Sequence, residues 1–316
     1  MSTDKAGTDK IGFMTDGIQA VFEHAGCAGT LCVQPLDGDA TIELAADELV
    51  SPASVVKVQI ALEVETWIAE GRLDPSEPVS LRAAGRTFGT TGISLFDDDA
   101  IISWRDLVVL MLTISDNQAA DSLLNRVGAG AVNATAARLG LTSTVVTSGI
   151  QAMLDSIGQE LGSAGWSGLL ARAAEASADG PAQTDQRLLA TRALDPARGT
   201  RTTARDMARL LRLIWTGQAG PAAACDRVKA LMARQLTRHR MASAFRPPVK
   251  VAAKSGSLFG VIRNEIGVIS YPDGHQYAAA VFTRSPFGSD EAAISHAIGT
   301  ATAQAVTALR QGLRAA

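Results

Sequence analysis

Strand-like alternation of hydrophobic and polar residues occurs near both ends of the chain. After a helical pattern over residues 11–24, two strand-like runs cover residues 30–35 and 40–44, joined by a short Asp-Gly-Asp turn. Before the C-terminus, three more strand-like runs and a closing helix cover residues 249–254, 262–271, 276–283 and 291–314. We therefore predict an α+β fold, in which one five-stranded antiparallel sheet combines both ends of the chain and is flanked by the terminal helices.

The middle of the chain has the period of helices instead. Residues 107–114 are almost entirely apolar, which predicts a helix buried on every side. Thr202-Thr203 is typical of a cap for a helix over residues 204–215. We expect two lobes, and the predicted ranges are 1–54 and 238–316 for a discontinuous sheet lobe, 55–237 for an inserted all-helical lobe, and about 150–199 for an enlarged loop region within it.

Composition and charge narrow the class of protein. The 316 residues are 47% hydrophobic and 19% charged, as in an ordinary globular protein with a substantial core. A formal net charge of -3 with scattered arginines predicts no nucleic-acid partner, and no apolar run is long enough to span a membrane. Residues 1–10 lack the apolar core of an export signal, so we expect a cytoplasmic protein if Met1 is the natural start. The oligomeric state stays open.

Cysteine and histidine are too few and too scattered to indicate a metal site. Cys27, Cys32 and Cys225 are an odd set without metal-type spacing, which predicts buried or free thiols instead of a disulfide framework. None of the four histidines is paired at i,i+4. We therefore expect chemistry that needs no metal and no cofactor.

A possible nucleophile and a possible base stand three residues apart, at Ser54 and Lys57. Pro52 and its small neighbours predict a helix start, and apolar residues then recur at helical spacing up to Ile68. Both side chains would lie on one helical face, and the apolar surroundings of Lys57 would favour a neutral amine that can accept a proton from a serine. The alternative is a solvated lysine after a capping serine, because Ser-x-x-Lys is common by chance.

A polar cluster, Ser115-Asp116-Asn117, comes directly after the apolar helix. All three residue types favour helix caps, so the cluster alone is explained by one helix that ends and another that begins. Its position after a buried run also allows a functional interpretation.

A second cluster, Lys254-Ser255-Gly256-Ser257, stands at the predicted end of a late strand. It offers a cation, a hydroxyl and a backbone N–H, which suit an anionic substrate and a developing oxyanion. A strand that leaves into a glycine turn would have the same sequence. Arg263, nine residues after Lys254, either binds a carboxylate or pairs in a surface network.

In this order, Ser-x-x-Lys, Ser-Asp-Asn and Lys-Ser-Gly resemble the motif set of class A β-lactamases and related penicillin-recognising serine hydrolases. The resemblance covers nearly the whole chain and implies the β-lactamase/DD-peptidase-like fold and a small substrate with an acyl group and a carboxylate. It implies these roles: Ser54 as acylated nucleophile, Lys57 as its base, Ser115 as proton relay, Lys254 as catalytic electrostatic anchor, Asn117, Ser255, Gly256 and Arg263 as substrate ligands, and the N–H groups of Ser54 and Ser257 as oxyanion hole.

The sequence departs from this family between the second and third motifs. Class A β-lactamases carry Glu-x-x-x-Asn there, and its glutamate activates the water that releases the acyl group. The glutamates in this part of the chain are Glu160 and Glu175, and neither has an asparagine four residues later. Asp185 or Gln186 could replace the glutamate in a rebuilt loop.

Three hypotheses follow. The first is a β-lactamase-like serine hydrolase that forms an acyl-enzyme on Ser54 and deacylates slowly. The second is a cytoplasmic esterase, D,D-peptidase-like hydrolase or transacylase that acts on a biosynthetic intermediate. The third is a noncatalytic protein that binds β-lactams or other acyl ligands. A serine-dependent glutaminase also uses Ser-x-x-Lys, but the other two motifs argue against it.

Overall fold

The computed structural model describes residues 15–175 and 181–315. The chain divides into two compact units, each built from separate stretches of sequence. The sheet unit comprises Met1–Glu48, Pro52–Val55 and Thr203–Ala316, and the helical unit comprises Leu49–Ser51 and Val56–Thr202. In the described part of the chain, no helix has both the length and the apolar character that crossing a membrane requires.

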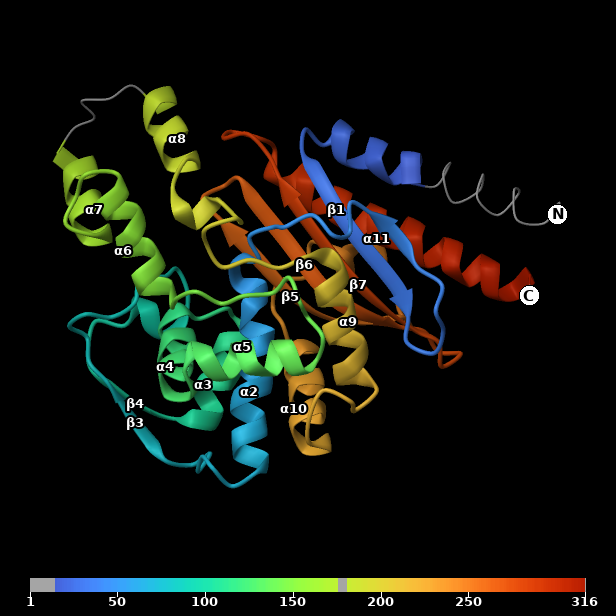
Figure 1. The fold of residues 1–316 in the computed structure, drawn as a ribbon, viewed down its shortest axis with the longest axis horizontal. Helices are drawn as coiled ribbons and strands as arrows, with labels where there is room; N and C mark the ends of the chain where they lie inside the picture. Colours follow the sequence, from blue (N-terminus) through green and yellow to red (C-terminus); the bar gives the residue numbers. More distant parts are fainter. Residues whose placement is uncertain (1–14, 176–180, 316) are drawn as a thin grey trace. The chain divides into compact units, whose positions relative to one another are not determined.

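The sheet unit contains five strands in the order β2-β1-β7-β6-β5 (Figure 1). All neighbouring pairs are antiparallel, and β1 from the N-terminal part pairs with β7 from the C-terminal part, with Leu31 opposite Val281. The predicted α+β fold with one sheet built from both ends of the chain is therefore confirmed. The strand bounds are β1 Ala28–Pro35, β2 Ile42–Leu44, β5 Lys250–Leu258, β6 Ile262–Ser270 and β7 Gln276–Arg284.

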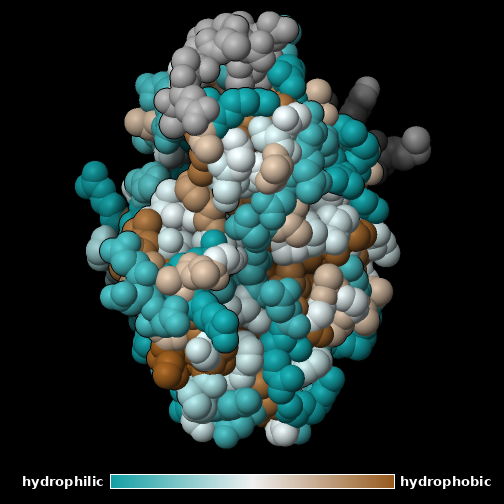
Figure 2. Space-filling view, turned by 90° about the vertical axis from the view of Figure 1, so that its left-hand side faces the viewer, coloured by the Kyte–Doolittle hydropathy of each residue, from teal (hydrophilic) through white to brown (hydrophobic). Residues whose placement is uncertain are grey.

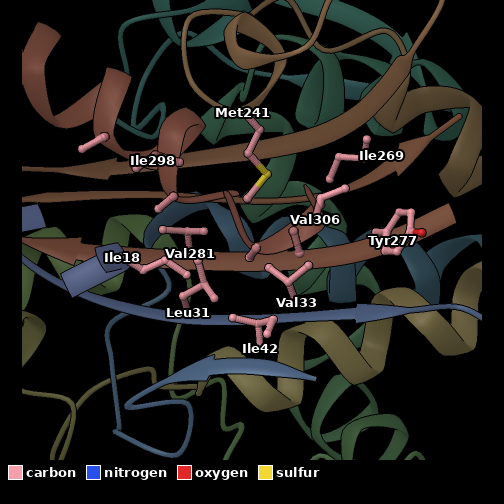
Figure 3. Packing of buried hydrophobic residues seen from close by; sticks show 14 of the residues in the cluster. Ile18, Leu31, Val33, Ile42, Met241, Ile269, Tyr277, Val281, Ile298 and Val306 are labelled. Atoms are coloured by element: carbon pink, nitrogen blue, oxygen red, sulfur yellow. The ribbon is translucent and has the colours of Figure 1, made fainter. Parts of the chain in front are cut away.

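One face of this sheet buries the main hydrophobic core of the unit (Figure 3). Successive side chains of a strand point to opposite faces, so Leu31 and Val33 of β1 reach the core together with Val281 of β7. The helix over residues 15–24 contributes Ile18, and α11 (Glu291–Ala315) contributes Ile298. The two terminal helices thus cover this face, as predicted. Residues 11–14 of the predicted first helix lie outside the described part.

On the other side of the sheet, α9 (Ala204–Trp215) packs against β7 and β1 (Figure 1). Thr203 caps this helix through a hydroxyl that accepts the Asp206 N–H at 3.1 Å, as the Thr-Thr pair predicts. The helix α10 (Ala222–Met232) packs against α9. Both helices belong to the compact sheet unit, which resumes at Thr203, whereas the sequence-based sheet lobe resumes at residue 238. The difference is α9 and α10, which cover the second face of the sheet.

In the helical unit, α2 (Lys57–Ala69) packs against α3, α4 and α5. It begins later than predicted, because Ala53–Val56 forms a 3-10 turn, η1, and the α-helix starts at Lys57. In α3, Val109 and Leu110 are only half-buried, so the prediction of a helix buried on every side is wrong for that face. The other bounds here are α3 Trp104–Thr113, α4 Asn117–Val127, α5 Ala129–Arg138, β3 Pro78–Leu81, η2 Gly92–Leu95 and β4 Ala100–Ser103, with β3 and β4 forming a two-stranded sheet.

The enlarged region that follows is mostly helical. It contains α6 Ile150–Glu160, α7 Trp166–Glu175, α8 Pro181–Leu189 and the short 3-10 helix η3 Arg192–Leu194. Asp121 of α4 holds its start, since the carboxylate accepts the N–H groups of Ile150 (2.6 Å) and Gln151 (2.8 Å).

On the face in Figure 2, hydrophobic residues occur as separate patches between polar ones. No single broad apolar surface dominates that view.

Candidate active site

Lys57 is a buried lysine within the helical unit. Its Nζ lies 2.6 Å from Ser115 O, 2.7 Å from Asn117 Oδ1 and 3.1 Å from Ser115 Oγ. Burial lowers the pKa of Lys57 to about 7, although the charges of Asp116 and Asp121 act in the opposite direction. An ammonium donates to all three oxygens, whereas a neutral amine donates to the two carbonyl oxygens and offers its lone pair to the hydroxyl. Both protonation states fit these contacts, and burial is what favours the neutral form.

The junction between α3 and α4 presents Ser115 and Asn117 to this amine. Ser115 has a φ of 62°, a left-handed conformation that is uncommon outside glycine, and the chain turns there. The Asp116 carboxylate then caps α4 by accepting the Ala119 N–H at 3.1 Å. The helix-cap interpretation is thus correct for Asp116, while Ser115 and Asn117 both contact Lys57. One motif supplies both a structural and a candidate chemical part.

Ser54 lies on the η1 turn, against β5 of the sheet unit. A Cβ added to Gly256 would come within 2.8 Å of Pro52 O and 3.0 Å of Ser54 N, so the two backbones are in close contact. Asn264 of β6 attaches the turn to the sheet by donating its Nδ2–H to Pro52 O at 3.1 Å. Only glycine permits this approach at position 256. The sequence-based alternative of a glycine turn after the strand is therefore wrong.

The Lys-Ser-Gly-Ser motif lies inside β5, not at its end as predicted, and β5 is an edge strand of the sheet. The Ser255 N–H points away from β6, because it donates to Gln235 Oε1. Residues two apart in a strand direct their backbone groups to the same side, so the Ser257 N–H also faces the open edge. Lys254 is fully buried, and its Nζ donates to Ser255 O at 2.8 Å.

Arg240 braces the same part of β5, although no sequence signal identified it. Its guanidinium donates to Gly256 O (2.9 Å), to Asn264 O (2.7 Å) and to Ser257 Oγ (2.7 Å). Because the side chain is buried, the carbonyl groups of β5 and β6 that it contacts would lose a hydrogen-bond partner away from water if it were removed. Arg238 and His239 surround it in the sequence, so local composition could not distinguish Arg240 from a surface arginine.

Arg263, the other predicted substrate ligand, is already engaged with protein groups. The residue is 3% exposed, and its guanidinium donates to Gly260 O at 2.6 Å and forms an ion pair with Glu291 of α11. This pair matches the sequence-based alternative of an arginine in an ion-pair network, but the arginine is buried instead of solvated. Carboxylate binding by Arg263 stays a prediction.

The residues considered for the deacylating role lie on helices of the enlarged region. Glu160 is paired with Arg192, accepting its backbone N–H at 3.0 Å, while Asp185 and Gln186 lie on α8. Glu175 is the last residue of α7.

The chain matches the model of the Beta-lactamase enzyme family over residues 14–309, and it belongs to this family. The fold agrees. A β-lactamase from Sphaerobacter thermophilus superposes with a TM-score of 0.74 at 23% identity, covering 94% of this chain and 96% of that one. PBP-A superposes with a TM-score of 0.73 at 20% identity, with the same two coverages.

Among individual proteins, the chain is similar to the β-lactamase regulatory protein BlaB of Streptomyces cacaoi. The two are 29% identical over 311 residues, which cover 94% of this chain and 96% of BlaB. The family resemblance inferred from the three motifs is confirmed by these matches. They leave the chemical role of each motif residue to experiment.

Proposed function

We propose that the protein forms an acyl ester on Ser54 with small β-lactam-like or related acyl compounds that carry a carboxylate. The observation that carries this proposal is the buried Lys57, whose lowered pKa and contacts with Ser115 suit a base. Lys57 follows Ser54 by three residues in the chain. Gly256 and the edge-facing N–H of Ser257 add the features that an oxyanion site needs.

The proposed acylation has two steps, attack on the acyl carbon and loss of the leaving group. The Ser54 Oγ attacks the acyl carbon while neutral Lys57 takes the hydroxyl proton, and the negative charge develops on the acyl oxygen. The N–H groups of Ser54 and Ser257 stabilise that oxyanion. When the tetrahedral intermediate collapses, the bond to the leaving nitrogen or oxygen breaks, the Ser115 hydroxyl gives its proton to that atom, and Ser115 takes up the proton held by Lys57, which returns to its neutral form. Asn117 would bind the side-chain amide, and Lys254 with Ser255 would anchor the carboxylate.

We further propose that the acyl group leaves slowly. The family's deacylating glutamate segment is missing from the sequence, and Glu160 is tied to Arg192. A long-lived adduct fits a receptor better than a resistance enzyme. The similarity to a regulatory protein supports the role of a receptor. Under this version, acylation reports the presence of the ligand and hydrolysis only resets the protein.

Intact-protein mass spectrometry during incubation with benzylpenicillin tests both proposals. We expect one equivalent of penicilloyl mass that Ser54→Ala abolishes and that persists over hours. Thr113→Ala, which removes a hydroxyl on α3 that donates to Val109 O, is the control and should leave the adduct intact. Rapid loss of the adduct with turnover would show a β-lactamase proper. Absence of any Ser54 adduct with penicillins, activated esters or fluorophosphonates would contradict covalent chemistry and leave a noncatalytic binding protein.

Turnover of p-nitrophenyl esters or of peptides ending in D-amino acids separates the remaining alternatives. Ester or peptide hydrolysis without penicillin turnover would indicate the esterase or D,D-peptidase-like activity. Transfer of the acyl group to an added amine would indicate a transacylase. Each of these outcomes shares the acylation step at Ser54 and differs only in how the ester is resolved.

A further inference from the structure

Side chains close part of the open edge of β5. The Ser255 N–H donates to Gln235 Oε1 at 2.5 Å, and Val251 O accepts from Arg238 Nη1 at 2.9 Å. Ser255 O accepts a hydrogen bond from Lys254 Nζ at 2.8 Å. These are outward-facing groups that a neighbouring strand would use for pairing. A peptide therefore cannot add to β5 over residues 251–255 without displacing these partners.

Gln235 is held firmly in this position. It is 4% exposed, and its Nε2 donates to Thr237 O at 2.9 Å and to Glu265 Oε1 at 3.2 Å. The other oxygen of Glu265 accepts the Met241 N–H at 2.6 Å. The two ends of the Gln235 amide thus have partners of opposite kind, and a flip would set donor against donor at Ser255. The amide acts as a fixed substitute for one residue of a sixth strand.

The next outward-facing backbone groups along β5 belong to Ser257, two residues beyond Ser255. They lie next to Gly256, whose backbone is in contact with the Ser54 turn. An acyl group at Ser54 can therefore pair with β5 at Ser257. A chain that continued from there toward Val251 would meet Gln235 first.

We propose that Gln235 sets the substrate size by restricting backbone pairing on β5 to Ser257. This inference rests on the proposed acylation of Ser54 and narrows its substrates to compact acyl donors with a carboxylate close to the scissile bond. Extended peptides that would pair along the strand on the leaving-group side are excluded. The carboxylate end points to this side because Lys254 and Ser255, the proposed anchor, lie on the Val251 side of Ser257 along β5.

Two thioesters that differ only in the leaving group test the proposal. The compact probe is N-benzoylglycyl thioglycolate, and the extended probe carries Gly-Gly on the thioglycolate carboxylate. Acylation is followed by thiol release and by intact mass. We expect the wild-type protein to react at least about tenfold faster with the compact probe, because the extended one must leave a buried polar group unpaired. Gln235→Ala should bring the two rates within about threefold.

The control is Gln276→Ala, which removes a glutamine bonded to Ser270 Oγ at 2.8 Å elsewhere in the same sheet and should keep the wild-type ratio. A purely structural loss would slow both probes equally. If Gln235→Ala does not fold, Gln235→Asn keeps an amide that is one methylene too short and should give the same change. Equal wild-type rates, or an unchanged ratio in the variant, would overturn this inference alone. Failure of both probes to acylate Ser54 would overturn the proposed function as well.

Discussion

The protonation state of Lys57 decides whether this residue can serve as a base. Removal from water penalises the charged amine, and this effect is larger than the opposing attraction of Asp116 and Asp121. The two carbonyl-type oxygens around Nζ would also accept from an ammonium, so hydrogen bonding alone does not select the neutral form. Desolvation is therefore the physical cause of a base that works near neutral pH, where an exposed lysine would be almost fully charged.

The rate of Ser54 acylation should consequently follow the neutral fraction of Lys57. Because burial lowers the pKa to about 7, the amine gains its lone pair as the pH rises through this value. We expect the pseudo-first-order rate with benzylpenicillin to be about tenfold lower at pH 6 than on a plateau above pH 8. Incubations at pH values between 5.5 and 9, stopped at set times and analysed by intact-protein mass spectrometry, measure this acylation rate.

A flat profile, or a rise centred near the usual pKa of lysine, would contradict this assignment. Lys57→Gln should remove both the rate and its pH dependence. Lys229→Gln is the matched control, because this lysine pairs with Asp226 at 3.0 Å on α10 and should leave the profile unchanged.

At the scale of elements, Asp116 links α4 to η2, which lies before β4 and α3 in the chain. Its carboxylate accepts the Ala119 N–H as an N-cap and the Ile93 N–H of η2 at 2.6 Å, and the residue is fully buried. Asp116→Ala should lower the free energy of unfolding by about 2–4 kcal/mol, from a lost cap of about 1 kcal/mol and an unpaired buried N–H of about 1–3 kcal/mol. Urea denaturation measures this loss.

The exposed cap of α3 provides the comparison. Ser103 caps α3 there by accepting the Asp106 N–H at 3.3 Å, so Ser103→Ala should cost only about 1 kcal/mol. Equal effects of the two substitutions would show that the bond to Ile93 contributes nothing. The variant Asp116→Ala should also slow acylation, since Ser115 and Asn117 flank the residue it replaces.

Elements with a local signal were predictable from the sequence, and those that depend on distant contacts were not. The start of α9 follows from the Thr203 cap, a contact that spans three residues. The end of β5 was placed too early because glycine at 256 weakens a strand locally, whereas the strand continues to accommodate the Ser54 turn. Gln235 and Arg240 act on β5 from 20 and 16 residues away, and nothing in their neighbourhood signals it.

The same distinction applies to the candidate site. Ser54, Lys57, Ser115 and Lys254 could be selected because their motifs occur in order, and the structure adds that Lys57 contacts Ser115 directly. Arg263 follows from its spacing after Lys254 and from the family resemblance, but its guanidinium is paired with Glu291 from a helix that begins 28 residues later in the chain. Spacing in the sequence indicates which residues are candidates for the site, but only the packing of the folded chain decides what each side chain contacts.

At the scale of the whole molecule, the sheet unit depends on both ends of the chain. The strand β1 lies between β2 and β7, and the core beneath it contains residues from the helix over residues 15–24 and from α11. Ser54 contacts β5 in this unit, so its position depends on a sheet that forms only after the last strand has been synthesised. Such long-range pairing implies slow folding compared with a helical bundle of similar size.

Truncation of the core at α11 should therefore destabilise the unit that carries Ser54. Ile298 is fully buried among residues of the sheet and of both terminal helices, so Ile298→Ala should lower the free energy of unfolding by about 2–5 kcal/mol through lost burial and the cavity left behind. Ile101→Ala, at a side chain that is 74% exposed on β4, should change it by less than about 0.5 kcal/mol. Chemical denaturation of both variants measures the difference, and acylation at low denaturant shows whether the Ser54 turn is lost together with the core. If Ile298→Ala proved as mild as Ile101→Ala, α11 would be a peripheral cover, and the dependence of the nucleophile on both chain ends would have to be abandoned.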